Sequence, residues 1–217
     1  MRQLDAIREA AEANFLEDFG TFTVEAGDHL PAGTKSVMLL GPREPGFWTH
    51  VKAEREFRDR VQDPLDTWSH RVISDLADTF GLTAIFPFIG PPYSPFFTFA
   101  LRTNRAWVSP VQWLVHDRAG LMLSYRGGLC FPEALEGTAQ QASPCESCTT
   151  KPCLTACPVN AFEGGEYDIS ACRTYLTENT GAECMSAGCR ARVLCPISQT
   201  YAREPRQSAY HMRKFME

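Results

Sequence analysis

The sequence predicts an α+β protein made of two units. Helix-like and strand-like segments alternate through the first 138 residues, eight of the nine cysteines lie beyond residue 144, and a small, polar stretch at 136–144 separates the two regions. A chain of 217 residues is long enough for one sizeable core and a small appended module. We therefore expect an N-terminal domain of mixed sheet and helices over residues 1–138 and a small cysteine-rich domain over residues 139–217.

Two segments of the N-terminal domain have the apolar spacing of amphipathic helices. Residues 2–18 carry apolar side chains at helical spacing and are followed by Gly20. The second helix is predicted to begin at Asp63, with Pro64 in its first turn, and to end at a Gly81 cap. A less regular helical pattern lies between them, over residues 47–61.

Short apolar or alternating runs predict the strands. Residues 111–116 and 121–125 are joined by the turn sequence DRAG and predict a β-hairpin, to which residues 128–131 are expected to add a strand. Three further strands are predicted over residues 21–26, 36–40 and 83–88.

Aromatic residues are dense just after the last of these strands. Such side chains can form the wall of a site for a flat cofactor, but they serve equally as core residues, which is the interpretation we favour. The residues are Tyr93, Phe96, Phe97 and Phe99.

The cysteine spacing indicates iron–sulfur chemistry. The first four cysteines form a C-x2-C-x4-C-x3-C-P run, and the second four also end in Cys-Pro. Soft thiolates on a tight loop are typical iron–sulfur ligands, and in two-cluster ferredoxins the cysteine before proline ligates the other cluster. Eight thiolates suffice for two 4Fe-4S clusters. We therefore assign Cys145, Cys148, Cys153 and Cys195 to cluster 1, and Cys157, Cys172, Cys184 and Cys189 to cluster 2.

Zinc and disulfides are the alternatives for these cysteines. A bare C-x2-C also suits a zinc ribbon, but the compact third and fourth cysteines and the repeated Cys-Pro favour iron–sulfur ligation. Disulfides require an oxidising compartment, whereas the N-terminal stretch is charged and has no apolar signal core, so we expect reduced thiols and a cytoplasmic location. Cys130, outside the run, is expected to be a buried hydrophobe.

Composition and charge argue against a membrane protein and against nucleic acid as a partner. The apolar runs are much shorter than a bilayer span, and the formal net charge is -5. Residues 190–217 nevertheless hold six basic and two acidic side chains. Because a four-iron cluster with four thiolates is anionic, we attribute this local excess to cluster compensation or partner docking.

The segment DISACRTYLTEN (168–179), after a ferredoxin-type run, resembles the epoxyqueuosine reductase family of cobalamin-dependent iron–sulfur enzymes. In that family a similar segment carries a ligand of the second cluster, a role that falls to Cys172. Residues 113–131 are similar, more weakly, to the strand pair ahead of the family's clusters. The resemblance implies a nitroreductase-like or cobalamin-reductase-like N-terminal domain with mixed sheet and helices, a dicluster ferredoxin-like C-terminal domain, and cobalamin as a further cofactor.

The chain also departs from that family. Neither the family's glycine-rich turn nor its acidic general acid is found in residues 88–112, so no catalytic residue and no cofactor-binding residue is assigned. The late cysteines are also spaced more widely, as C-x4-C-x5-C-P.

Three functional hypotheses follow. The leading one is an iron–sulfur redox protein that passes electrons from a redox partner protein to an acceptor bound to, or docked on, the N-terminal domain. The second is a cobalamin-dependent reductase in which the clusters feed a corrinoid. The third is an interaction module whose clusters are structural, since metal sites can supply folding energy.

Overall fold

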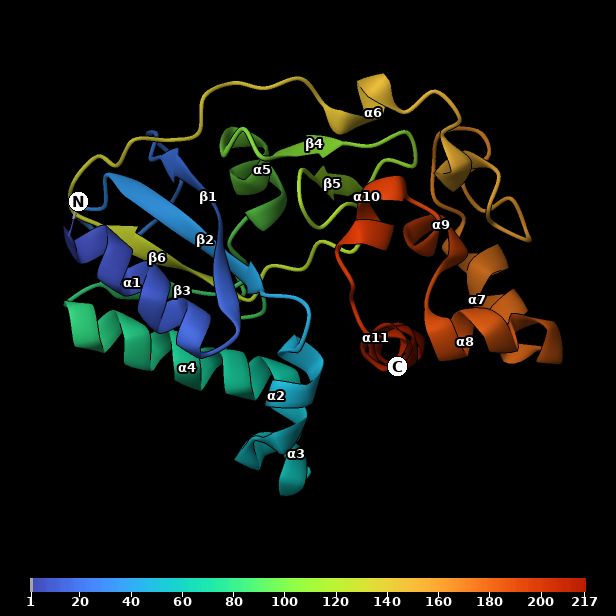
Figure 1. Ribbon diagram of the computed structural model, residues 1–217, viewed down its shortest axis with the longest axis horizontal. Helices are drawn as coiled ribbons and strands as arrows, with labels where there is room; N and C mark the ends of the chain where they lie inside the picture. Colours follow the sequence, from blue (N-terminus) through green and yellow to red (C-terminus); the bar gives the residue numbers. More distant parts are fainter. Residues whose placement is uncertain (1) are drawn as a thin grey trace. The chain divides into compact units, whose positions relative to one another are not determined.

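The structure, a computed structural model, describes residues 2–217 apart from the side chains of Arg2 and Asn179. The predicted α+β class is confirmed, with helices accompanying small antiparallel sheets (Figure 1). The chain forms two compact units. The first comprises Met1–Arg105 and Ser124–Gln141, and the second comprises Ala106–Leu123 and Ala142–Glu217. Residues 106–123, expected in the N-terminal domain, therefore group with the cysteine-rich region.

A four-stranded antiparallel sheet forms the centre of the first unit. Its order is β1-β2-β6-β3, and β2 is buried along its whole length. Gly127 at the start of β6 allows close packing of the longest helix on the sheet, because a Cβ there would lie 2.8 Å from Ile73 Cδ1. The strands are β1 (Leu16–Thr23), β2 (Ser36–Pro42), β3 (Thr83–Ile85) and β6 (Gly127–Phe131).

Helices cover both faces of this sheet. In Figure 1, α1 (Arg2–Ala13) and α4 (Pro64–Phe80) lie on one side and α5 (Phe96–Arg102) on the other. The predicted helix after Asp63 is confirmed as α4, which ends at Gly81 in the left-handed conformation with φ 68°. The irregular helix predicted over 47–61 is two short helices, α2 (Phe47–Ala53) and α3 (Arg55–Arg58).

The predicted helix over residues 2–18 is wrong in its last five residues. The helix ends at Ala13, Phe15 adopts a positive φ of 54°, and Leu16 begins β1 by pairing with Pro42. Pairing with the buried strand β2 thus overrides the helical spacing of the last residues. The strand predicted over 21–26 is the end of β1, which stops at Thr23.

A buried ion pair joins α3 to α4. Glu56 is only 4% exposed, and its carboxylate accepts hydrogen bonds from Arg71 Nε at 2.6 Å and from Arg71 Nη2 at 3.1 Å. These hydrogen bonds lower the pKa of Glu56 from an ordinary 4.5 to about 2. Because the pKa is depressed in the folded state, the pair stabilises the first unit at neutral pH, and this contribution is lost as the pH falls from about 4.5 toward 2.

We expect Glu56→Gln to lower the free energy of unfolding by roughly 2 kcal/mol at pH 7. The difference from wild type should shrink as the pH is lowered to about 3. Urea unfolding followed through the fluorescence of Trp68 in α4 measures both. Glu9→Gln, at an exposed position of α1, is the matched control and should follow wild type. A loss from Glu56→Gln that does not change with pH would contradict this prediction.

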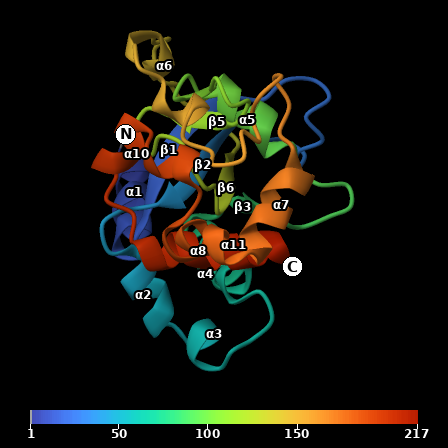
Figure 2. The same cartoon turned by 90° about the vertical axis from the view of Figure 1, so that its right-hand side faces the viewer.

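The second unit combines a two-stranded ribbon with short helices. Its longest helices, α7 and α11, lie with α8 in the C-terminal part, where α8 and α11 are side by side (Figures 1 and 2). Gly188 allows this approach, since a Cβ there would lie 2.6 Å from Ser208 Cβ. The elements are β4 (Ala106–Val108), β5 (Leu114–His116), α6 (Pro144–Ser147), the 3-10 helix η1 (Pro152–Leu154), α7 (Ile169–Thr177), the 3-10 helix η2 (Asn179–Gly181), α8 (Ala182–Ala187), α9 (Arg190–Val193), α10 (Pro196–Thr200) and α11 (Pro205–Met216).

The predicted hairpin of residues 111–116 and 121–125 is wrong. Strand β5 pairs with β4, which precedes it, and residues 121–125 form no strand. The fully buried His116 holds the intervening turn instead, because its Nδ1 accepts hydrogen bonds from the backbone N–H groups of Arg118 and Ala119. The strand predicted at 128–131 is β6, which belongs to the sheet of the first unit.

None of the helices within residues 2–217 has both the length and the apolar character needed to cross a membrane.

Candidate metal centre

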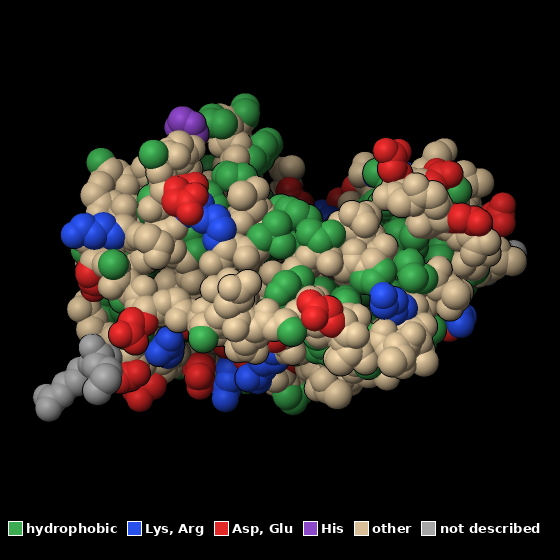
Figure 3. Space-filling model, turned by 90° about the horizontal axis from the view of Figure 1, so that it is seen from above, with side chains coloured by type: hydrophobic (Ala, Val, Ile, Leu, Met, Phe, Trp, Pro, Cys, Tyr) green, Lys and Arg blue, Asp and Glu red, His purple; other side chains and the backbone are tan. Residues whose placement is uncertain are grey.

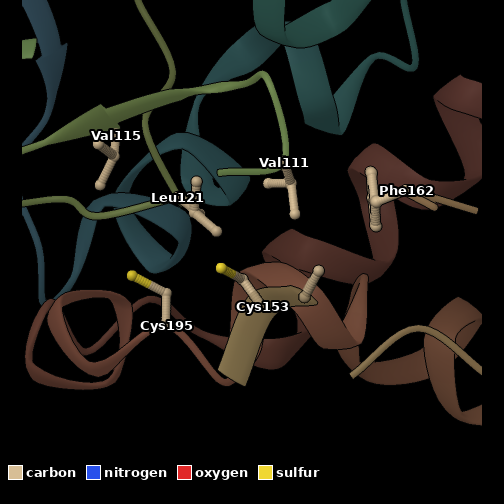
Figure 4. Close-up of a cluster of buried hydrophobic side chains, with 7 residues drawn as sticks. Val111, Val115, Leu121, Cys153, Phe162 and Cys195 are labelled. Carbon is tan, nitrogen blue, oxygen red and sulfur yellow. The ribbon is translucent and has the colours of Figure 1, made fainter. Parts of the chain in front are cut away.

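Four of the eight predicted ligand cysteines line one cavity of about 350 Å³ in the second unit. They are Cys145, Cys148, Cys153 and Cys195, the same four that the cysteine spacing predicts as ligands of cluster 1. Figure 4 shows the sulfur atoms of Cys153 and Cys195 pointing toward the side chains of Leu121 and Val115. The fold therefore brings a cysteine from the end of the chain to the first cysteine run.

The cavity has a buried floor and an exposed rim. Cys153 and Cys195 are 7% and 8% exposed, and the apolar side chains of Val115 and Leu121 beside them are almost completely buried. The rim residues Ser147, Thr149, Thr150 and Lys151 are exposed. A group bound here would be shielded from water on one side and accessible on the other.

Local caps fix the cysteines of this set. Ser143 caps α6: its Oγ accepts from Cys145 N–H at 3.3 Å, and its own N–H donates to Glu146 Oε1 at 3.3 Å. Cys153 lies within η1, which follows Lys151 in a left-handed conformation with φ 39°. Cys195 immediately precedes α10, whose first residue is Pro196.

Segment 106–123 supplies the wall opposite these cysteines. Leu121 N–H donates to Ser198 Oγ at 2.9 Å, and Leu121 O accepts from Arg192 Nη1 at 2.6 Å. Arg203 Nη1 also donates to Met122 O at 3.0 Å. These hydrogen bonds attach the segment to α9, to α10 and to the turn that follows α10.

The second predicted set is spread along the chain: Cys157 lies between η1 and α7, Cys172 in α7, Cys184 in α8, and Cys189 immediately before α9. Cys157 Sγ accepts a hydrogen bond from Ala161 N–H at 3.3 Å. The Tyr167 hydroxyl donates a hydrogen bond to the side chain of Cys172. Sulfur atoms with donors already in place can carry negative charge more easily.

Neighbouring thiols raise one another's pKa within each predicted set. Burial is the largest cause that raises the pKa of Cys153, and the nearby Cys145, Cys195 and Cys148 raise it further. In the other set, burial raises the pKa of Cys184, and Cys189 and Cys172 add to the effect. Burial also raises the pKa of Cys172, with further contributions from Cys189 and Cys157. In each case the cysteines that act on one another belong to the same predicted set. Crowded thiols resist ionisation unless a cation joins them.

An aromatic group packs beside both sets. Trp113 contacts Phe162 and Tyr167 edge to face, with ring centroids 4.8 and 5.1 Å apart, and Phe162 stacks on Tyr167. Trp113, Tyr167 and cysteines of both sets pack against the same buried core, which includes Val111, Leu121, Phe162 and Ala191. Both sets are thus built into one core of the second unit.

Arg192 is the basic residue of the C-terminal stretch that lies nearest this core. Its guanidinium lies 4.2 Å from the ring centroid of Trp113, and its pKa is lowered by burial but raised by Cys189 and Tyr167. Arg190 instead pairs with Glu183 at 2.7 Å. On the molecular face seen in Figure 3, Lys and Arg side chains are interspersed with Asp and Glu side chains.

Thiolate donors around a cavity fit a polynuclear iron–sulfur group, which occupies the space among its ligands. Across residues 2–217, no three or more His, Cys, Asp or Glu side chains are placed to hold one metal ion together. The four cysteines predicted for cluster 1 instead line, together with other residues, a cavity of about 350 Å³. Thiolates are the donor type that suits a 4Fe-4S cluster.

The other residues singled out in the sequence belong to the first unit. Cys130 is buried in β6, and burial raises its pKa to about 11, as suits a small core residue. Phe96 and Phe99 are also core residues, whereas Tyr93 and Phe97 are 62% and 47% exposed. The aromatic stretch therefore does not form a single wall.

Sequence reasoning missed the residues of segment 106–123 that line the cavity, chiefly Ser109 and Leu121. They precede the first cluster cysteine by more than twenty residues, and no motif marks them. Their position depends on hydrogen bonds to Ser198 and Arg192, which lie much later in the chain.

Comparisons of the chain with protein-family models, curated proteins and solved structures find no match. The likeness to the epoxyqueuosine reductase family therefore rests on the quoted sequence segments alone. The arrangement of the cysteines is the basis for the proposal that follows from this structure.

Proposed function

We propose that this protein is an iron–sulfur redox protein with two 4Fe-4S clusters, which transfers electrons to an acceptor bound to or docked on the first unit. The observation that carries the proposal is the cavity lined by Cys145, Cys148, Cys153 and Cys195. Three of these thiols come from one short run and the fourth from the far end of the cysteine region, as in two-cluster ferredoxins. Cys157, Cys172, Cys184 and Cys189 are the proposed ligands of the second cluster.

The residues around the cavity have distinct tasks in this proposal. The thiolates provide the soft donors that iron–sulfur clusters require. Val115 and Leu121 exclude water from the floor, while the exposed rim at Lys151 gives a redox partner access. Bound clusters supply one-electron transfer, and the surrounding hydrogen bonds and charges set their potentials.

The expected composition of anaerobically purified protein is about eight irons and about eight acid-labile sulfides per chain. EPR spectra before and after dithionite should show reduced clusters that interact magnetically. Zinc without sulfide would overturn the proposal and identify the second unit as a structural metal module. Clusters that cannot be reduced and reoxidised would instead support a structural role.

We also propose kinship with the epoxyqueuosine reductase family, with a nitroreductase-like first unit and a ferredoxin-like second unit. The segment around Cys172 and the C-x2-C-x4-C-x3-C-P run support this relationship. Titration with hydroxocobalamin tests its catalytic consequence. A spectral shift and retained cobalt after desalting would favour a cobalamin-dependent reductase, and no retained corrinoid would favour an electron carrier.

A further inference from the structure

Ser109 is a buried serine on the wall of the cluster 1 cavity. Its side chain is almost completely enclosed, with 3% of the residue exposed, and it lines the cavity with the four cysteines. Among the described residues, its Oγ has no hydrogen-bond partner. A buried hydroxyl without a partner is unfavourable, so an acceptor bound in the cavity would explain its presence.

The backbone holds Ser109 firmly in this position. Its N–H donates to Trp113 O at 2.8 Å, and its carbonyl accepts from Gln112 N–H at 2.9 Å. The turn follows β4 directly and returns the chain to β5. The serine hydroxyl is therefore presented by a closed turn and not by a loose loop.

The other serine of the cavity differs from Ser109 in the properties that matter. Ser147 is exposed at the rim, and its Oγ already donates to Pro144 O at 3.2 Å. It lines the same cavity but needs no further partner. The pair thus offers an internal comparison between a buried, unpartnered hydroxyl and an exposed, partnered one.

We propose that the Ser109 hydroxyl donates a hydrogen bond to a sulfur of the group held by Cys145, Cys148, Cys153 and Cys195, and thereby raises the reduction potential of that group. The inference rests on the proposed function. Reduction adds one electron from an external donor such as dithionite, and the added negative charge resides partly on sulfur. Because hydrogen bonds to charged acceptors are stronger than those to less charged ones, the bond stabilises the reduced state more than the oxidised state. Ser109 is accordingly a positioning and tuning residue, not a ligand.

The test is a redox titration monitored by EPR on wild type, Ser109→Ala and the control Ser147→Ala. We expect Ser109→Ala to shift the midpoint potential of one cluster to more negative values, corresponding to on the order of a tenfold change in its reduction equilibrium. The other cluster, and both clusters of Ser147→Ala, should keep their potentials. Unchanged potentials in a fully loaded Ser109→Ala protein would overturn the inference.

A second pair of variants covers the case in which Ser109→Ala does not retain its cluster. Ser109→Thr and Ser109→Val introduce side chains of nearly equal shape that differ in the hydroxyl group. The threonine variant should have the higher potential, and equal potentials would overturn the inference. Iron and sulfide analysis of the same samples distinguishes failure of the proposed function from failure of the role of Ser109. Wild type without sulfide refutes the proposed function. Full loading with equal potentials refutes only the role of Ser109.

Discussion

Alanine at Cys195 is expected to remove the same one of the two proposed clusters as alanine at Cys145, leaving about four of the about eight irons and sulfides that the proposed function requires. The reason is structural, because both cysteines line the cavity whose floor is formed around Cys153. Loss of either thiolate opens one corner of the site, and a cubane held by three thiolates is readily lost. The remaining cluster should give an EPR spectrum free of magnetic coupling in both variants.

The control for this experiment is Cys130→Ala. Cys130 is buried in β6 of the first unit and belongs to neither cysteine set, so iron and sulfide should be unchanged. Cys172→Ala should remove the other cluster and leave a different spectrum. If Cys195→Ala gave the spectrum of Cys172→Ala instead, the assignment of Cys195 to cluster 1 would be wrong.

Alanine at Gly120 is expected to destabilise the second unit by roughly 2 to 5 kcal/mol. Gly120 has a φ of +56°, and a Cβ there would lie 2.5 Å from the backbone nitrogen of Ser198 and 2.6 Å from Ser198 Oγ. Since backbone atoms are among those contacted, the turn must move away from α10. That movement breaks the hydrogen bond between Leu121 N–H and Ser198 Oγ and opens the wall of the cavity.

Chemical unfolding of the second unit, followed through Trp113 fluorescence, measures this loss, and iron analysis shows whether cluster 1 is retained. Gly164→Ala is a matched control in the same unit, because Gly164 also has a positive φ, of +88°, but a Cβ there would meet nothing within 4 Å. The difference between the variants isolates the clash with Ser198. Equal stabilities would show that the approach of Gly120 to α10 is unimportant.

Local signals were sufficient for part of the fold. Helix α4 begins at Pro64 and ends before Gly81, because the proline in the first turn, the apolar spacing and the terminal glycine all indicate the same bounds. The end of α1 could not be predicted in the same way. Leu16 continues the helical spacing of the preceding residues, but its pairing with Pro42 in β2 is a contact between distant residues.

The candidate site, too, could be predicted from local sequence signals only in part. Spacing within the chain suggested the eight cysteine ligands, since a tight loop fixes which thiols can share a cluster. The wall of the cavity depends instead on the close approach of Gly120 to Ser198, and neither residue type signals the other. The hairpin prediction failed for the same reason, because His116 caps a turn that sends Leu121 toward the cysteines and away from a strand.

Residues 106–123 belong to the second unit, although segments of the first unit precede and follow them in the sequence. The second unit is therefore not a terminal appendage. The chain leaves the first unit after Arg105, returns to it at Ser124 to form β6, and leaves it again after Gln141. During synthesis, the residues that form one wall of the cavity therefore leave the ribosome well before the four cysteines that line it. A fragment that begins near residue 140 would carry all eight predicted ligand cysteines but would lack Val115 and Leu121, which line the cavity with Cys153 and Cys195.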